Sequence, residues 1–176
     1  MALKGDRYEL ETTVDFFWKS DGDFITAERG GIATVSTAGS GAALDQSAAL
    51  VTYTAAQSGA SPMGVLLNDV VNLDQTRQHI NFHKNEVQTG GKVTLLKKGW
   101  IVTNQLDPGD LTGGGKIAAG DTAFVGPSGL ISNKQTGPTG PSAAGAAIGH
   151  FDSIVDEDGY AKISINIPQS HNTLIV

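Results

Sequence analysis

The chain has 176 residues, enough for one domain with an arm or a lobe attached. It contains no cysteine, which excludes disulfides and thiolate metal sites, and its net charge of −6 argues against general nucleic-acid binding, which needs a stripe of lysine and arginine. Its 23 glycines and 6 prolines, set among many valines and isoleucines, favour short strands and turns over long helices.

No membrane segment is expected. The opening segment MALKGDRYELETT lacks the apolar core of a secretory signal peptide. Apolar runs such as Ala48–Val51 and Met63–Leu67 are too short to cross a bilayer. We therefore expect a protein that is made and assembled in a cytoplasm.

Residues 1–20 are interpreted as an N-terminal arm. Polar and apolar residues alternate over Tyr8–Val14, which predicts a strand that covers something on one face. The densest aromatic cluster of the chain follows: Phe16, Phe17 and Trp18. These side chains either plug the core or dock on a partner. In the second case, truncating residues 1–20 would weaken attachment far more than it destabilises the remaining domain.

Residues 21–176 are expected to form one β-rich domain, with a possible sub-boundary near residues 104–116. Strand patterns in its first half cover Phe24–Ala27, Gly31–Ser36, Ala48–Thr54 and Pro62–Val71. The pattern of residues 74–86 fits either a short helix capped by Asp74 or a strand.

The second half is the more regular. Lys92–Leu96 and Trp100–Thr103 are predicted strands on either side of a Lys-Lys-Gly sequence. GDTAFVGPSGLIS (residues 120–132) reads as a strand, a Gly-Pro-Ser-Gly corner and a second strand. Residues 146–152 and 160–167 predict a hairpin joined by an acidic Asp-Gly turn. We expect a mainly β fold, a small β-barrel or β-sandwich with an extended N-terminal arm and little helix.

The strongest metal candidate is His79 with His83, four residues apart and followed by Glu86. The pair lacks the glutamate that follows the first histidine of a metalloprotease motif, and no third ligand is evident. Histidines that form hydrogen bonds at a surface or subunit interface are the favoured interpretation. A hydrolase that uses His79 or His83 with a nearby carboxylate is the most distant alternative.

Other motifs also fail on chemistry. The acidic group Asp152, Asp156, Glu157 and Asp158 does not make an EF-hand, because Ile154 and Ile165 fall at ligand positions. Gly113–Lys116 is not a phosphate loop, since Ile117 stands where serine or threonine must bind magnesium. No Gly-x-Ser-x-Gly elbow occurs. We therefore expect no catalytic, cofactor or metal site, and a protein that is not an enzyme.

The order of elements after Pro62 is informative. Gly120–Val125, a glycine turn, Leu130–Ser132, Ala147–Phe151 and an acidic turn into Ala161–Ile165 resemble the small barrel of tailed-phage capsid decoration (cement) proteins. The resemblance covers about residues 62–167. It implies a homotrimer on the capsid exterior of a virion that binds neighbouring major capsid protein subunits and carries no cofactor. Phe16, Phe17 and Trp18 are then the candidate capsid contacts.

A second hypothesis comes from another functional class. The chain is then a tail- or baseplate-associated receptor- or glycan-binding module. Such a module needs exposed aromatic rings as platforms for sugars, and Trp18 and Trp100 are the first candidates.

Overall fold

The computed structural model describes residues 2–19, 26–37, 50–54, 60–72, 85–108, 116–134 and 145–167. Strands make up 55% and helices 4% of these residues, which confirms the expected mainly β fold with little helix. His79, His83 and most of the ambiguous segment 74–86 lie outside the described residues, as does the first half of the predicted strand Phe24–Ala27.

The strands form where apolar and polar residues alternate or where short apolar runs occur. They are β1 (Tyr8–Trp18), β2 (Ile32–Thr37), β3 (Leu50–Thr52), β4 (Pro62–Leu66), β5 (Asp69–Val71), β6 (Glu86–Gln88), β7 (Lys92–Thr103), β8 (Thr122–Val125), β9 (Ile131–Ser132), β10 (Ala147–Phe151) and β11 (Ala161–Asn166), with a 3-10 turn η3 (Pro127–Gly129) between β8 and β9.

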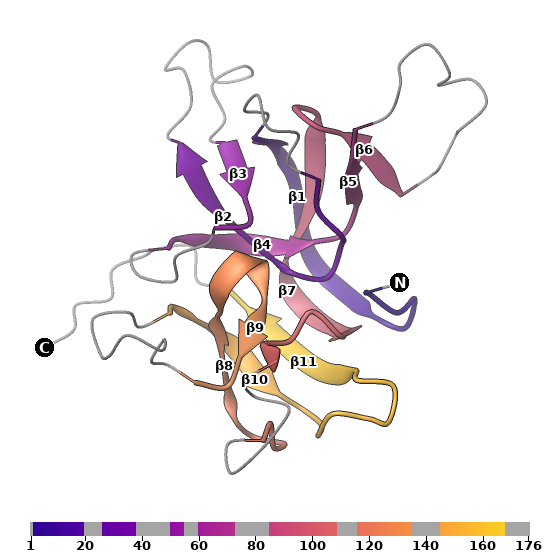
Figure 1. Cartoon of the computed structure of the whole chain (residues 1–176), viewed down its shortest axis with the longest axis vertical. Coiled ribbons are helices and arrows are strands. Elements are labelled where there is room, and N and C mark those ends of the chain that lie inside the picture. The colour runs from indigo at the N-terminus through magenta and orange to yellow at the C-terminus, as the bar shows by residue number, and fades with distance from the viewer. Residues whose placement is uncertain are drawn as a thin grey trace, which may run out of the picture.

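Five strands close into a small barrel in the upper part of Figure 1. β1 pairs with β7, β7 with β4, β4 with β2, and β2 with β3, all antiparallel. β3 then pairs in parallel with the end of β1, at Phe17–Leu50 and Trp18–Val51, which completes the ring. Its core consists of the buried residues Trp18, Ala33, Val51, Leu66, Val70, Val93 and Leu95.

A second lobe is built on the far end of β7. β11, β10, β8 and β9 follow one another in antiparallel order, and a bridge between Ile131 and Leu106 brings the sheet back toward the chain that leaves β7. The expected hairpin is formed by β10 and β11. The fully buried residues of this lobe include Ile101, Ile131, Ile148, Phe151, Ile163 and Ile165.

β2, β4 and β7 form a wall between the two cores, and β4 crosses the middle of the molecule in Figure 1. Successive residues of these strands point to opposite faces. Each face is therefore buried in a different core: Ile32, Val65 and Leu96 belong to the core of the second lobe, and Ala33, Leu66 and Leu95 to that of the barrel. Burial on both sides explains why the sequence shows short apolar runs here in place of alternation.

β7 is one strand of 12 residues, although the Lys97-Lys98-Gly99 sequence suggests a break. Gly99 has a φ of +144°, and a Cβ atom at this position would overlap the carbonyl oxygen of Tyr8 on β1. The glycine therefore allows the backbone of β1 to lie close to β7. Irregular register beside Glu11 accommodates the extra lysine without ending the strand.

The Gly-Pro-Ser-Gly corner joins the second lobe to the barrel. Its 3-10 turn places Ser128 in the left-handed region, at φ 54° and ψ 33°, and the Ser128 N–H donates to the Thr54 carbonyl at 2.7 Å. Gly129 lies against the ring of Tyr53, which a Cβ atom at this position would overlap. Val125, directly before the corner, and Ile131, two residues after it, are buried.

Tyr53 contacts two other segments of the chain. Its hydroxyl donates to the Glu28 carbonyl at 2.7 Å and accepts the Gly31 N–H at 3.1 Å, while its ring meets Trp18 edge-on at 5.2 Å between centroids. Burial raises the pKa of the Tyr53 hydroxyl well above its usual value, so that the hydroxyl stays protonated as a donor.

Replacing Tyr53 by phenylalanine is expected to lower the free energy of unfolding by about 1–3 kcal/mol. The ring contacts remain, but the Glu28 carbonyl and Gly31 N–H lose their partner. Denaturant unfolding measures the change. Tyr8→Phe is the control, since Tyr8 is 53% exposed and its substitution should shift the free energy by less than about 0.5 kcal/mol. Equal effects of the two changes would contradict the assigned role of Tyr53.

Candidate docking surface

β1 carries most of the large apolar side chains that face solvent. Among the described residues, four such side chains are exposed: Tyr8, Leu10 and Val14 at 53%, 57% and 53%, and Ile154 at 67%. Three of the four are on this strand, within seven residues. Single exposed apolar residues are common on soluble proteins, but a contiguous set indicates an interaction surface.

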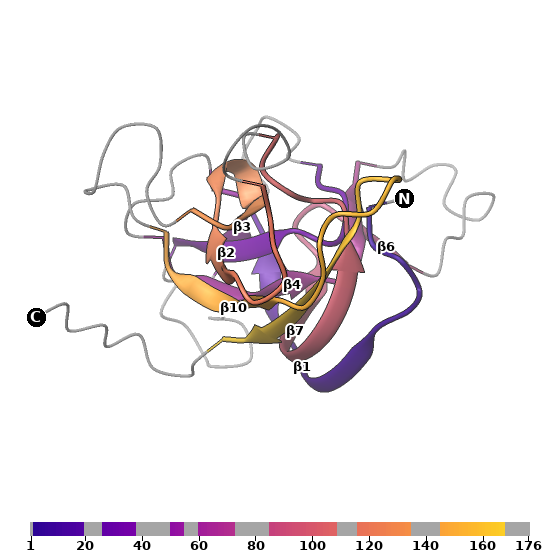
Figure 2. The same ribbon diagram turned by 90° about the horizontal axis from the view of Figure 1, so that it is seen from below.

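The backbone of β1 is half paired. One edge follows β7 from Tyr8 to Phe17, whereas the other edge pairs with β3 only through Phe17 and Trp18. Within the described part of the chain, no strand pairs with the second edge over residues 8–16. Figure 2 shows β1 on the outside of the molecule next to β7. This open edge, together with the exposed side chains of Tyr8, Leu10 and Val14, forms what we call the β1 surface.

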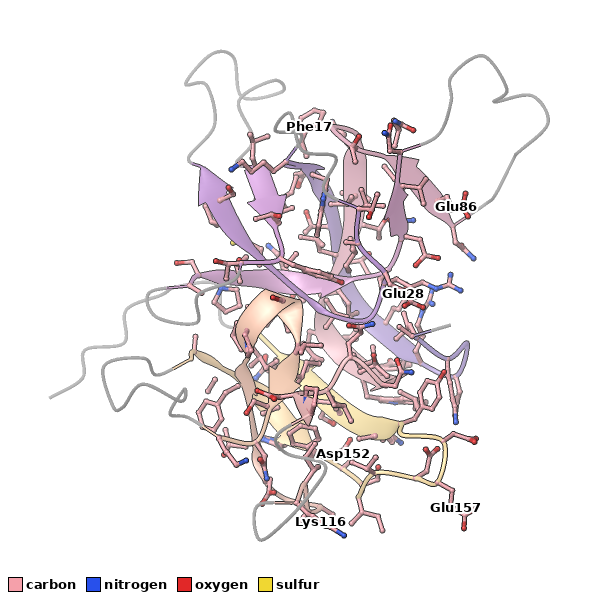
Figure 3. All side chains as sticks on the ribbon, viewed as in Figure 1. Phe17, Glu28, Glu86, Lys116, Asp152 and Glu157 are labelled. Carbon is pink, nitrogen blue, oxygen red and sulfur yellow. The ribbon has the colours of Figure 1, made fainter. Side chains whose placement is uncertain are left out.

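The aromatic cluster divides between core and surface. Trp18 has no exposed area and packs inside the barrel, so it presents no side-chain surface to a partner in this conformation. Phe16 is half-buried against the same core, with the Lys97 ammonium 5.9 Å from its ring centroid. Phe17 is also half-buried, with the Lys92 ammonium at 5.4 Å, and Figure 3 shows it at the upper end of the barrel. Phe16 and Phe17 retain the surface that contact would need.

The segment before β1 is part of the fold as well. Ala2 and Leu3 are buried, Leu3 bridges to Thr103, and the Thr103 hydroxyl donates to the Ala2 carbonyl at 3.0 Å. The N-terminal segment is extended, as expected, but it is hydrogen-bonded to the domain. Truncating residues 1–20 would remove Leu3 and Trp18 from the two cores. Such a truncation cannot separate attachment from folding, so point substitutions are needed.

Carboxylates alternate with the exposed apolar residues of β1. Glu9 forms an ion pair with Arg7, and Asp15 accepts a hydrogen bond from the Thr13 hydroxyl at 2.9 Å. Glu11 lies opposite Lys98 of β7 in the strand register. The strand therefore carries three carboxylates among its exposed apolar residues, and the paired strand β7 carries lysines.

The outer face of β7 bears on the glycan-binding hypothesis. Trp100 pairs with Tyr8 on one side and Ser164 on the other, and the Lys162 ammonium lies 4.0 Å from the Trp100 ring centroid. A lysine over the indole occupies a ring face that a sugar would use. Trp18, the other candidate platform, is buried.

Asp156, in the acidic turn between β10 and β11, has a structural role. Asp156 accepts the backbone N–H groups of Tyr160 at 2.7 Å and Asp158 at 3.0 Å, and the Lys4 ammonium lies 3.1 Å from its carboxylate. The Tyr160 hydrogen bond is the largest cause that lowers the pKa of Asp156, followed by the contact with Lys4. In Figure 3, Asp152 and Glu157 mark this end of the molecule.

Within the described ranges, no three histidine or acidic side chains come together as a metal site. The same residues contain no helix long and apolar enough to span a membrane. In comparisons with known proteins, no family model matches the chain, and no curated protein matches it significantly.

Proposed function

We propose that this chain is a structural, non-enzymatic virion protein that binds the outer surface of a tailed-phage capsid. There it stabilises the contacts between major capsid protein subunits. The observation that carries the proposal is the β1 surface of the closed barrel. It has three exposed apolar side chains and, among the described residues, a backbone edge with no strand partner over residues 8–16. Such a surface suits contact with a partner protein, through its apolar side chains and through its backbone edge.

The resemblance to capsid decoration proteins supports the same proposal. The residues that carry it, from Gly120 to Ile165, form strands β8 to β11 of the second lobe. This lobe is tied to the barrel through β7 and through Tyr53, so that force applied at β1 reaches both cores. A decoration protein needs this kind of connection, because it resists the outward pressure on the shell.

Because many copies bind to one shell, each interface needs to contribute only a modest binding free energy. A stable interface buries about 1,600 Å² in total, of which one exposed strand and its flanks supply a part. An open strand edge can accept a strand from a neighbour, which adds main-chain hydrogen bonds to the side-chain contacts. Repetition around a symmetric shell, and the homotrimer that we include in the proposal, multiply modest contacts.

The experiment adds the purified protein to undecorated, expanded capsids of its own virus. We expect saturable binding and a higher temperature of capsid rupture. No binding, with no gain in heat resistance, would refute the proposal.

The variant Leu10→Ser with Val14→Ser tests the surface itself. We expect capsid affinity to fall at least about tenfold, because two half-exposed apolar side chains no longer lose water on binding. The unfolding midpoint should change little, since both side chains already face solvent. Ile154→Ser is the control: it removes an apolar side chain that is 67% exposed and lies outside β1, and it should leave affinity unchanged. A loss of affinity in the control alone would move the contact away from β1.

A further inference from the structure

A row of aromatic and polar side chains crosses the outer face of the second lobe. Side chains of residues that lie opposite each other in neighbouring strands project to the same face of a sheet. The strand pairs β1–β7, β7–β11, β11–β10 and β10–β8 each supply one such match, and successive matches share a residue. From strand to strand, the row consists of Tyr8, Trp100, Ser164, His150 and Thr122. We call it the lobe row.

The lobe row faces solvent. Side chains alternate between the two faces along a strand, and the chain neighbours Ile101, Ile163 and Phe151 are buried in the core of the second lobe. All members of the row are exposed or half-buried. Figure 1 shows β7, β11, β10 and β8 side by side in the lower part of the molecule, so the row forms one continuous strip.

Most polar groups of the lobe row are not used within the described part of the chain. There, the Trp100 indole N–H, the His150 ring and the Tyr8 hydroxyl form no hydrogen bond. Ser164 differs, because its hydroxyl donates to the Asp152 carboxylate at 2.6 Å. The row therefore presents an aromatic platform together with hydrogen-bonding groups that a ligand can use.

Lys162 adds a cation to this platform. Its ammonium lies 4.0 Å from the Trp100 ring centroid, and it forms no ion pair with any carboxylate that the structure describes. Asp152 lies beside it, since the Asp152 N–H donates to the Lys162 carbonyl at 2.8 Å, but the Asp152 carboxylate is directed to the Ser164 hydroxyl. The ammonium is thus held by the indole and lacks a counter-ion from the described residues.

We propose that the lobe row binds a short acidic saccharide. Trp100 is the platform on which a sugar ring stacks, and the indole N–H and the His150 ring form hydrogen bonds with hydroxyls of the saccharide. A neutral sugar would displace the Lys162 ammonium from the indole without giving it a new partner. A uronic acid offers its carboxylate to the displaced ammonium, so that a charge-assisted hydrogen bond replaces the cation–π contact. The lysine therefore selects acidic sugars over neutral ones.

The distance from Trp100 to His150 sets the length of the ligand. Neighbouring strands lie about 4.8 Å apart, so these two residues, which are two strands apart, are separated by about 10 Å. A short oligosaccharide can contact both. On a decorated capsid, many copies of the row would multiply weak binding at each one, so that the particle adheres to an acidic polysaccharide. Only this last step rests on the function proposed above.

The first test measures saccharide binding to the full chain by calorimetry and tryptophan fluorescence. Of the two tryptophans, Trp18 is fully buried, so fluorescence reports a ligand at Trp100. The probes are short fragments of polygalacturonate, alginate and hyaluronan, and the controls are their methyl esters, which keep the rings but lose the charge. In about 0.1 M NaCl, which screens the net charge of the chain beyond about 10 Å, we expect at least one acid to bind about tenfold more tightly than its ester.

The preference for this acid should shrink in about 1 M NaCl, where the screening length is about 3 Å. Two results would overturn the proposal: no binding of any acidic fragment, or equal binding of acids and esters. The measurements contain no capsids, so their failure is distinct from a failure of the proposed function.

The second test uses substitutions at the surface. Lys162→Gln should lower the affinity for the acid to that for its ester, and Lys162→Arg should retain the preference. Lys116→Gln is the matched control: it removes an exposed lysine outside the lobe row, at the lower end of the molecule in Figure 3, and it should leave binding unchanged. Equal losses in Lys162→Gln and Lys116→Gln would show that net charge, and not the row, carries the binding, which would also overturn the proposal.

Trp100→Phe separates a saccharide from a protein partner. We expect this variant to weaken binding of the acid and of its ester alike, because both stack on the indole. If no saccharide binds and Trp100→Phe weakens attachment to capsids instead, the row is a contact with the capsid protein and the saccharide proposal is wrong. Circular dichroism confirms that each variant is folded.

Discussion

Replacing Trp18 by alanine is expected to lower the free energy of unfolding by about 3–5 kcal/mol. Trp18 is fully buried at the point where β1 and β3 close the barrel, and its ring contacts Tyr53. Removing the indole leaves a cavity, and burying an aromatic residue contributes this much in protein cores. Because a domain is stable by only about 5–15 kcal/mol, the loss would be visible in any denaturation curve. Urea unfolding followed by circular dichroism provides the measurement.

The same substitution tests whether the aromatic cluster belongs to the core or serves as a docking anchor. Phe17→Ala is the comparison, since Phe17 is adjacent, half-buried and covered by Lys92 on one side. We expect it to cost less than half as much stability as Trp18→Ala. If Trp18→Ala instead folds with unchanged stability and loses capsid binding, then Trp18 is a docking residue and the burial described above does not hold in the assembled state.

Replacing Gly149 by alanine is expected to cost about 3 kcal/mol, which is at the upper end of what overpacking costs in a core. A Cβ atom at Gly149 would overlap the carbonyl oxygen of Ser164 on β11. That atom belongs to a backbone, which cannot move aside as the end of a side chain can. The two strands would have to separate at a point where Gly149 pairs with Ile165. Thermal unfolding would show a lower midpoint.

Gly159→Ala is the matched control for this change. Gly159 has a left-handed backbone conformation, with a φ of +83°, but beyond its chain neighbours no atom lies within 4 Å of the position that a Cβ atom would take. Its substitution should therefore cost only the strain of the left-handed conformation, about 1–2 kcal/mol. If the two variants are equally stable, close backbone approach at Gly149 is not the reason for its glycine.

Strand positions follow largely from the sequence, because the alternation and the short apolar runs are local signals. Tyr8–Val14, Gly31–Ser36 and the final hairpin are predicted close to where β1, β2, β10 and β11 lie. The local pattern does not show which strands pair with each other. The parallel pairing of β1 with β3 and of β5 with β6 joins residues far apart in the sequence, and nothing within either strand specifies it.

The two-core arrangement also goes beyond what the pattern can indicate. Leu95 and Leu96 are neighbours in an apolar run. The run indicates that both are buried, but it does not show that they face two different cores. Gly99 shows a similar limit: after two lysines it indicates a turn, whereas its actual role is to let β1 lie close to β7.

The candidate docking surface is predictable only in part. The alternation in Tyr8–Val14 predicts a strand with one apolar face, but it cannot say whether this chain covers that face. Here the chain leaves Tyr8, Leu10 and Val14 exposed, and it buries Trp18 from the adjoining aromatic cluster. Exposure depends on how far β3 extends along β1, which is a property of tertiary structure.

The wall formed by β2, β4 and β7 has a consequence for the integrity of the molecule. Each of these strands offers one side to each core, so neither core has a complete lining of its own. If the chain were cut near residues 104–116 and the two parts separated, the barrel fragment would expose one apolar face of β2, β4 and β7. The fragment with the second lobe would lack these three strands. We therefore expect the two lobes to unfold together in a single transition, because the loss of either core uncovers one face of the strands that line the other.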